Sequence, residues 1–124
     1  MNSMKNFFIS FFVGLLIAGI ILSTAMKAHA AEMPNIQKPS GLTVEEVEML
    51  LKHDLKGYGQ AFLNAEEDYQ IDCRFLIAVS ALESGWGRYQ FKDNNIFGFG
   101  SKDFDSIEHC IDYVAWFLRK NYLN

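Results

Sequence analysis

Hydrophobic residues at helical spacing predict two helices between residues 43 and 69. The stretch Thr43-Val-Glu-Glu46 has the pattern of a capping box, in which a Thr hydroxyl and a Glu carboxylate each satisfy a free backbone amide. Val47 and Leu51 continue the apolar face of this first helix. After the interruption "KGYGQ", apolar positions predict the second helix: Tyr58, Phe62, Ala65 and Tyr69. Its acidic residues are expected to point largely outward: Glu66, Glu67 and Asp68.

A third helix is predicted over residues 73–84, "CRFLIAVSALES", which is apolar on nearly every side. A helix of this kind is surrounded by other elements. Asp72 is the candidate N-cap, and Gly85 is the candidate stop because glycine adopts the left-handed conformation readily. Ser106 is the candidate N-cap of a fourth helix, "IEHCIDYVAWFLRKNY", whose apolar residues keep helical register.

The fold class predicted by these patterns is mainly α, with the third helix buried at its centre. No segment shows a convincing alternation of apolar and polar residues. Residues 95–100, "NIFGFG", are expected to form a short β or extended segment in the loop after the central helix. Gly98 and Gly100 allow a tight backbone there.

The first thirty residues have the pattern of an export signal. Lys5 precedes an apolar run, and Ala28-His29-Ala30 has the small-x-small form of a signal peptidase site. The apolar run is longer than the usual signal core of about 7–15 residues, so an uncleaved membrane anchor is the alternative. Residues 31–42 are predicted to be an exposed lead-in, and residues 43–124 to form the single domain. The protein is therefore expected to be secreted, or to contact a membrane through its N-terminal segment alone.

Composition argues against several classes of function. The 124-residue chain has a formal net charge of −4, and cleavage of a signal that carries two lysines makes it more acidic. An acidic domain without a basic stripe is a poor nucleic-acid binder. His53 and His109 lack the spacing of metal ligands, and no phosphate-binding glycine loop is present, so no metal and no cofactor are predicted. Cys73 and Cys110 allow either a disulfide or two buried thiols, and both possibilities stay open.

Glu83 is the candidate for chemistry. It lies in the last turn of the apolar third helix, where the helix dipole and desolvation both disfavour a charged carboxylate and raise its pKa. A carboxyl group that keeps its proton near neutral pH suits a general acid that protonates a glycosidic oxygen. The alternative is an ordinary solvated residue at a helix end. The loop that follows favours the interpretation of Glu83 as a general acid, because its aromatic rings and amides suit a sugar. These residues are Trp86, Tyr89, Phe91, Asn94, Asn95, Phe97 and Phe99.

The stretch "FLIAVSALESGWG" followed by "NNIFGFG" resembles the glucosaminidase family of bacterial peptidoglycan hydrolases, the endo-β-N-acetylglucosaminidase-like domains. The resemblance covers roughly residues 55 to 123. It implies a small lysozyme-like helical fold. It also implies cleavage of wall glycan strands between N-acetylglucosamine and N-acetylmuramic acid, with Glu83 as the general acid. It also implies a set of residues that shape the cleft: Ser84, Trp86, Asn95, Phe97 and Gly98. Asn94 joins this set as a candidate for substrate binding. The expected partner is the peptidoglycan glycan strand, bound by a monomer.

The second catalytic group is left open by the sequence. In acetamide-assisted enzymes the substrate replaces the second carboxylate, and Asp103 or Asp105 is a candidate to orient the acetamide or a water. The alternative for these two residues is a solvated loop in which Asp105 stabilises the N-terminus of the last helix. The run "SKDFDS" before the last helix is shorter than in many proteins that this chain resembles, which removes one expected wall of the groove. Two alternatives therefore remain beside the hydrolase. They are a lytic transglycosylase of the same fold and a glycan-binding module without activity.

Overall fold

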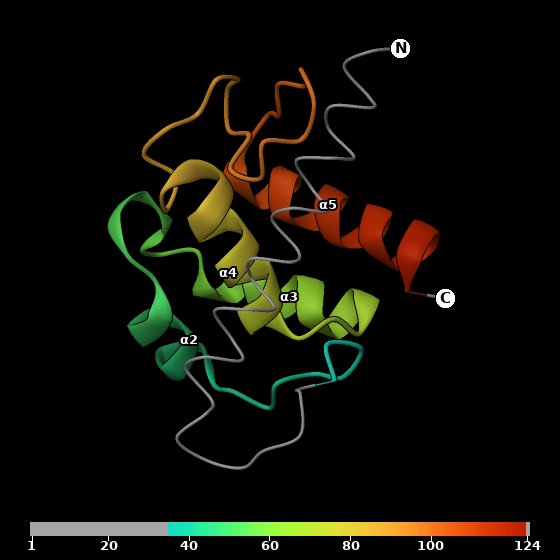
Figure 1. The fold of residues 1–124 in the computed structure, drawn as a ribbon. Helices are drawn as coiled ribbons and strands as arrows, with labels where there is room; N and C mark the ends of the chain where they lie inside the picture. Colours follow the sequence, from blue (N-terminus) through green and yellow to red (C-terminus); the bar gives the residue numbers. More distant parts are fainter. Residues whose placement is uncertain (1–34, 124) are drawn as a thin grey trace.

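The structure is a computed structural model, and it describes residues 35–123. These residues form four α-helices and one short 3-10 helix (Figure 1): α2 (Val44–Leu50), η1 (His53–Leu55), α3 (Gly59–Tyr69), α4 (Cys73–Ser84) and α5 (Ile107–Tyr122). The mainly α prediction is confirmed. The short β segment is not, because residues 95–100 form turns and no strand occurs in the described residues. The predicted export signal, residues 1–30, lies outside the described range.

The predicted helix ends are confirmed at four places. Thr43 and Glu46 form both hydrogen bonds of the capping box at the start of α2. Asp72 caps α4 by accepting the Arg74 amide, and Ser106 caps α5 by accepting the His109 amide. Gly85 ends α4 in the left-handed conformation, with φ of 56°. Local sequence signals therefore determine where the two longest helices begin and where α4 ends.

The start of α3 depends on a residue from another helix. Its N-cap, Tyr58, makes no side-chain capping hydrogen bond. The Glu48 carboxylate of α2 instead accepts the backbone amides of Gly57 and Gly59. A Cβ added to Gly59 would lie 2.6 Å from Glu48 Oε1, so the Glu48 side chain would have to shift from this position. The glycine interruption between the first two predicted helices is thus the point at which α2 docks onto α3.

The core lies where α3 contacts each of α2, α4 and α5. Figure 1 shows α5 running alongside α3, with the long loop before α5 folded over one end of the bundle. Helix α4 buries seven of its twelve residues, in agreement with its apolar sequence. The described lead-in residues, 35–42, are mostly exposed. Two of them, Ile36 and Leu42, pack partly on the core, and the Ile36 carbonyl accepts the Asp72 amide. No helix in the described part has the length and hydropathy of a membrane span.

Glu66 corrects one expectation of the sequence analysis. It was expected to point outward, but only 4% of its surface is exposed. Its carboxylate accepts the Cys73 backbone amide at 2.7 Å and the Ser40 hydroxyl at 3.0 Å. One buried acid thus joins α3, the first turn of α4 and the lead-in segment. The prediction failed because its hydrogen-bond partners come from other segments of the chain, and helical periodicity carries no information about them.

The two neighbouring glutamates of α3 offer a matched test of this junction. We expect Glu66→Ala to lower the free energy of unfolding by about 2 kcal/mol, because it leaves a buried amide without its acceptor. Glu67 is exposed, and Glu67→Ala is expected to change that free energy by less than about 0.5 kcal/mol. Urea unfolding of both variants measures the difference. Equal effects of the two substitutions would contradict the role given to Glu66.

Candidate active site

The last turn of α4 brings Glu83 to the wall of a small hollow. The hollow has a volume of about 110 Å³ and opens beneath the loop that follows the helix. The residues that line it come from the helix end and from that loop: Glu83, Tyr89, Phe91, Lys92, Asn95, Gly98 and Gly100. An acid, two aromatic rings, an amide and a cation therefore surround one small space.

The Glu83 side chain is partly buried, and burial raises the pKa of its carboxyl above the ordinary value. Desolvation has this effect because it disfavours the charged form. Within residues 35–123 its carboxylate has no hydrogen bond and no ion pair to oppose the shift. The carboxylate also lies against Gly98, where an added Cβ would be 3.2 Å from Glu83 Oε2. The absence of a side chain at Gly98 thus leaves room for the Glu83 carboxylate in the hollow. Gly98 also has a positive φ of 60°.

The segment Gly85-Trp86-Gly87 turns the chain sharply after α4. All three residues have a left-handed backbone, with φ of 56°, 65° and 83°. This conformation is strained for Trp86 and easy for the two glycines. Ser84 is buried and stabilises the turn, since its hydroxyl donates to the Ser80 carbonyl and accepts the Gly87 amide. The sequence "ESGWG" therefore has a backbone role in addition to any role toward a substrate.

The loop from residue 88 to residue 106 is organised by two asparagine side chains. Asn95 is buried, accepts the Phe99 amide and donates to the carbonyls of Phe99 and Lys102. Asn94 has a left-handed backbone, and its side chain donates to the Phe104 carbonyl. These bonds replace regular secondary structure in a segment that would otherwise leave polar groups unpaired. The side-chain amide of Asn95 is thus already hydrogen-bonded to the loop backbone.

The structure brings together only part of the predicted set of site residues. Asn95 and Gly98 line the hollow with Glu83. The other members do not line it: Ser84, Trp86, Asn94, Phe97 and Asp103. Of these, Phe97 is 1% exposed and packs in the core. Contact of any of these side chains with a substrate stays a prediction.

Trp86 and Asp103 have neighbours of their own. The Trp86 ring packs partly on the core, and the Lys52 ammonium group lies 5.6 Å from its centroid. Asp103 is exposed and accepts the Asp93 backbone amide at 2.9 Å. Asp105 is exposed and lies 3.6 Å from His109. Since none of these acids lines the hollow, the second catalytic group is not identified by position.

Four lining residues were absent from the predicted site set: Tyr89, Phe91, Lys92 and Gly100. The sequence contained a signal for the two aromatic residues, because both stand in the loop after Glu83. Helical spacing does not extend into this loop, so nothing in the pattern separated rings that enter the core from rings that stay outside. Phe97 and Phe91 illustrate the difference, since the first is buried and the second fully exposed.

Both cysteines are free thiols. Burial raises the pKa of Cys73 to about 12 and that of Cys110 to about 11, so neither thiol is a ready nucleophile. The Cys73 sulfur and one carboxylate oxygen each of Glu66 and Asp72 lie within 4.8 Å of one another, a spacing that could hold a metal ion. Asp72 already binds the Arg74 side chain through both carboxylate oxygens, and Glu66 accepts two hydrogen bonds. These contacts explain the cluster as a network that stabilises the junction of α3 and α4.

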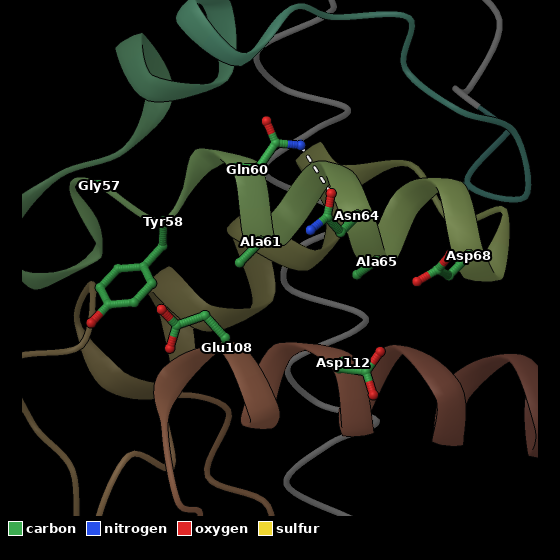
Figure 2. A pocket seen from close by; sticks show the side chains of 9 residues that line it. All are labelled: Gly57, Tyr58, Gln60, Ala61, Asn64, Ala65, Asp68, Glu108 and Asp112. Carbon is green, nitrogen blue, oxygen red and sulfur yellow. Dashed lines mark hydrogen bonds between the residues drawn. The ribbon is translucent and has the colours of Figure 1, made fainter.

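A second hollow lies between α3 and α5, away from Glu83. It has a volume of about 360 Å³, and Figure 2 shows Ala61 and Ala65 of α3 on the side toward α5, which carries Glu108 and Asp112. Its carboxylates are exposed to solvent: Asp68, Glu108 and Asp112. It is the larger of the two, but a general acid at neutral pH benefits from a carboxyl whose pKa is raised by burial, and Glu83 is the partly buried acid with such a shift. We therefore take the hollow at Glu83 as the candidate active site.

Comparison with known proteins identifies the family. A family profile described as "Mannosyl-glycoprotein endo-beta-N-acetylglucosaminidase" matches residues 59–124, more than half of the chain. The chain belongs to this glucosaminidase family, and the resemblance noted in the sequence is confirmed. Proteins named "Putative endo-beta-N-acetylglucosaminidase" from two strains of Streptococcus pneumoniae are each 37% identical over 81 residues. The alignment covers 56% of this chain, which spans only 12% of the length of each relative.

The raised pKa of Glu83 predicts how stability depends on pH. The folded protein holds the Glu83 proton more tightly than the unfolded chain, whose carboxyl has the ordinary pKa of 4.5. Ionisation of the buried group therefore lowers the free energy of unfolding as pH rises above that value. Glu83→Gln removes this cost, so we expect the variant to have the higher Tm at pH 7 and the difference to vanish below about pH 4.5.

Thermal unfolding by circular dichroism, recorded from about pH 4 to pH 7, measures this difference. Glu67→Gln is the control, because Glu67 is an exposed carboxylate. A Glu83→Gln variant with a lower Tm than the wild type at pH 7 would contradict the account of a carboxyl destabilised by burial.

Proposed function

We propose that this protein is an exported peptidoglycan hydrolase that cleaves β-1,4 bonds of N-acetylglucosamine in wall glycan strands. Glu83 is the general acid in this proposal. The observation that supports it is a partly buried carboxyl, unpaired within residues 35–123 and with a raised pKa, in a hollow beside exposed aromatic rings. Membership of the glucosaminidase family supports the same reaction class. Export is part of the proposal and rests on the signal pattern of residues 1–30.

The proposed reaction begins with proton transfer from Glu83 to the glycosidic oxygen. The bond between C1 and that oxygen breaks, and the leaving sugar departs with a hydroxyl group. The acetamide oxygen of the same N-acetylglucosamine then attacks C1 and forms a cyclic intermediate. Water opens this ring and returns a proton to Glu83, which leaves a reducing N-acetylglucosamine end. This route needs no second carboxylate in the hollow, which agrees with the single acid among its lining residues.

The size of the hollow constrains how a glycan strand binds. Its volume of about 110 Å³ is well below the roughly 300–1,000 Å³ of ordinary small-molecule pockets. It therefore accommodates the part of the sugar nearest the scissile bond, while the rest of the strand lies across the exposed loop. The short "SKDFDS" segment of this chain is consistent with such an open site.

Removal of the acid tests the proposal. We expect Glu83→Gln to reduce clearing of purified peptidoglycan by at least about 100-fold, because a positioned general acid contributes a factor of that order or more. Turbidity of wall suspensions measures the rate. Glu108→Gln is the matched control, since Glu108 belongs to the other hollow, and it is expected to keep the wild-type rate.

The products of wall digestion separate the related activities. Mass spectrometry is expected to find reducing N-acetylglucosamine ends, whereas anhydromuramic ends would assign the protein as a lytic transglycosylase. Full activity of Glu83→Gln would contradict the assignment of the acid. Binding of peptidoglycan by wild type and variant, with no cleavage by either, would contradict the hydrolase and favour a glycan-binding module.

A further inference from the structure

Two aromatic side chains at the rim of the Glu83 hollow are unusually exposed. Tyr89 is 68% exposed and Phe91 is 102% exposed, and both line the same space as the acid. Phenylalanine side chains are normally buried or half-buried in folded proteins. The ring of Phe91 therefore contributes nothing to the core, and it is open to contact with a ligand in the hollow.

Tyr89 is exposed, yet its position is well defined. Its ring lies directly on Gly85, where an added Cβ would be 2.9 Å from Tyr89 Cδ2. The Arg88 guanidinium lies 5.4 Å from the ring centroid, and the Arg88 side chain is held by the Gly85 carbonyl. The Tyr89 backbone amide donates to the Ser84 carbonyl at 2.9 Å. The helix end that carries Glu83 thus also fixes Tyr89, so the acid and the ring are positioned by the same turn.

The chemistry of these neighbours fits one kind of ligand. Exposed aromatic faces bind flat apolar surfaces, and the C–H face of a pyranose ring is such a surface. The Asn95 amide is already used within the loop, so the remaining charged side chains of the lining are Glu83 and Lys92. An N-acetylated sugar presents an apolar ring face to the aromatic rings and hydroxyl and acetamide groups to these polar side chains.

We propose that Tyr89 and Phe91 form a stacking platform for the N-acetylhexosamine unit next to the bond that Glu83 protonates. This inference rests on the proposed function, and it adds the residues that hold the glycan in an otherwise shallow site. Tyr89 supplies a rigid ring that is backed by Gly85 and Arg88. Phe91 supplies the more exposed ring at the outer edge of the hollow.

Phe91 gives the sharper test, because its full exposure means that substitution does not disturb the fold. We expect Phe91→Ala to weaken binding of a β-1,4-linked N-acetylglucosamine tetramer by about five- to tenfold, which corresponds to the loss of one aromatic contact. Binding is measured by calorimetry in the Glu83→Gln background, where cleavage does not interfere. Phe91→Trp is expected to retain affinity. Met49→Ala is the control, since Met49 is 78% exposed on α2 and lines neither hollow.

The outcomes separate this inference from the proposed function. Unchanged affinity in Phe91→Ala, with wall cleavage intact in the protein that retains Glu83, would overturn the platform and leave the hydrolase standing. Binding that depends on Phe91 without any cleavage by the wild type would support the platform and overturn the hydrolase. A dimer in sedimentation experiments that Phe91→Ala dissociates, with unchanged sugar affinity, would show that the ring serves self-association and would overturn the platform.

Discussion

The candidate site depends on one carboxyl group, Glu83, that the fold partly removes from water without providing a partner from residues 35–123. Glu83 lies in the last turn of the apolar helix α4, and partial burial raises the pKa of its side chain. A buried acid in this state destabilises the folded protein at neutral pH, because its ionisation is disfavoured. The surroundings preserve this condition. Gly98 lets the carboxylate approach the loop backbone, and the cations Arg88 and Lys92 form no ion pair with it among the described residues.

The long loop after α4 keeps the acid in this environment. Its polar groups are satisfied by Asn94 and Asn95, and its apolar residues Ile96, Phe97 and Phe104 anchor it in the core. Two parts of the loop therefore differ in role. Residues that face inward make the loop rigid, while Tyr89 and Phe91 face outward at the rim of the hollow. In the proposed function, the exposed rings of such an open site hold the substrate, and the chemistry takes place in the small space beside Glu83.

Local signals made the helices and their ends predictable from the sequence. Capping residues such as Thr43, Asp72 and Ser106, and the stop at Gly85, act through neighbours only a few residues away. The burial of Glu66 and the inward position of Phe97 depend on contacts between distant segments, and a pattern along the chain does not record such contacts. Glu83 could be selected as the candidate acid because its position near a helix end is itself a local property.

The most direct test of the central claim is titration of the Glu83 carboxyl carbon by NMR in isotopically labelled protein, with Glu83→Gln used to assign the resonance. We expect a single titration step whose midpoint lies above the ordinary glutamate pKa of 4.5. A midpoint at or below that value would mean that the carboxylate is solvated or paired in solution. Glu83 would then lack the proton that a general acid must deliver near neutral pH.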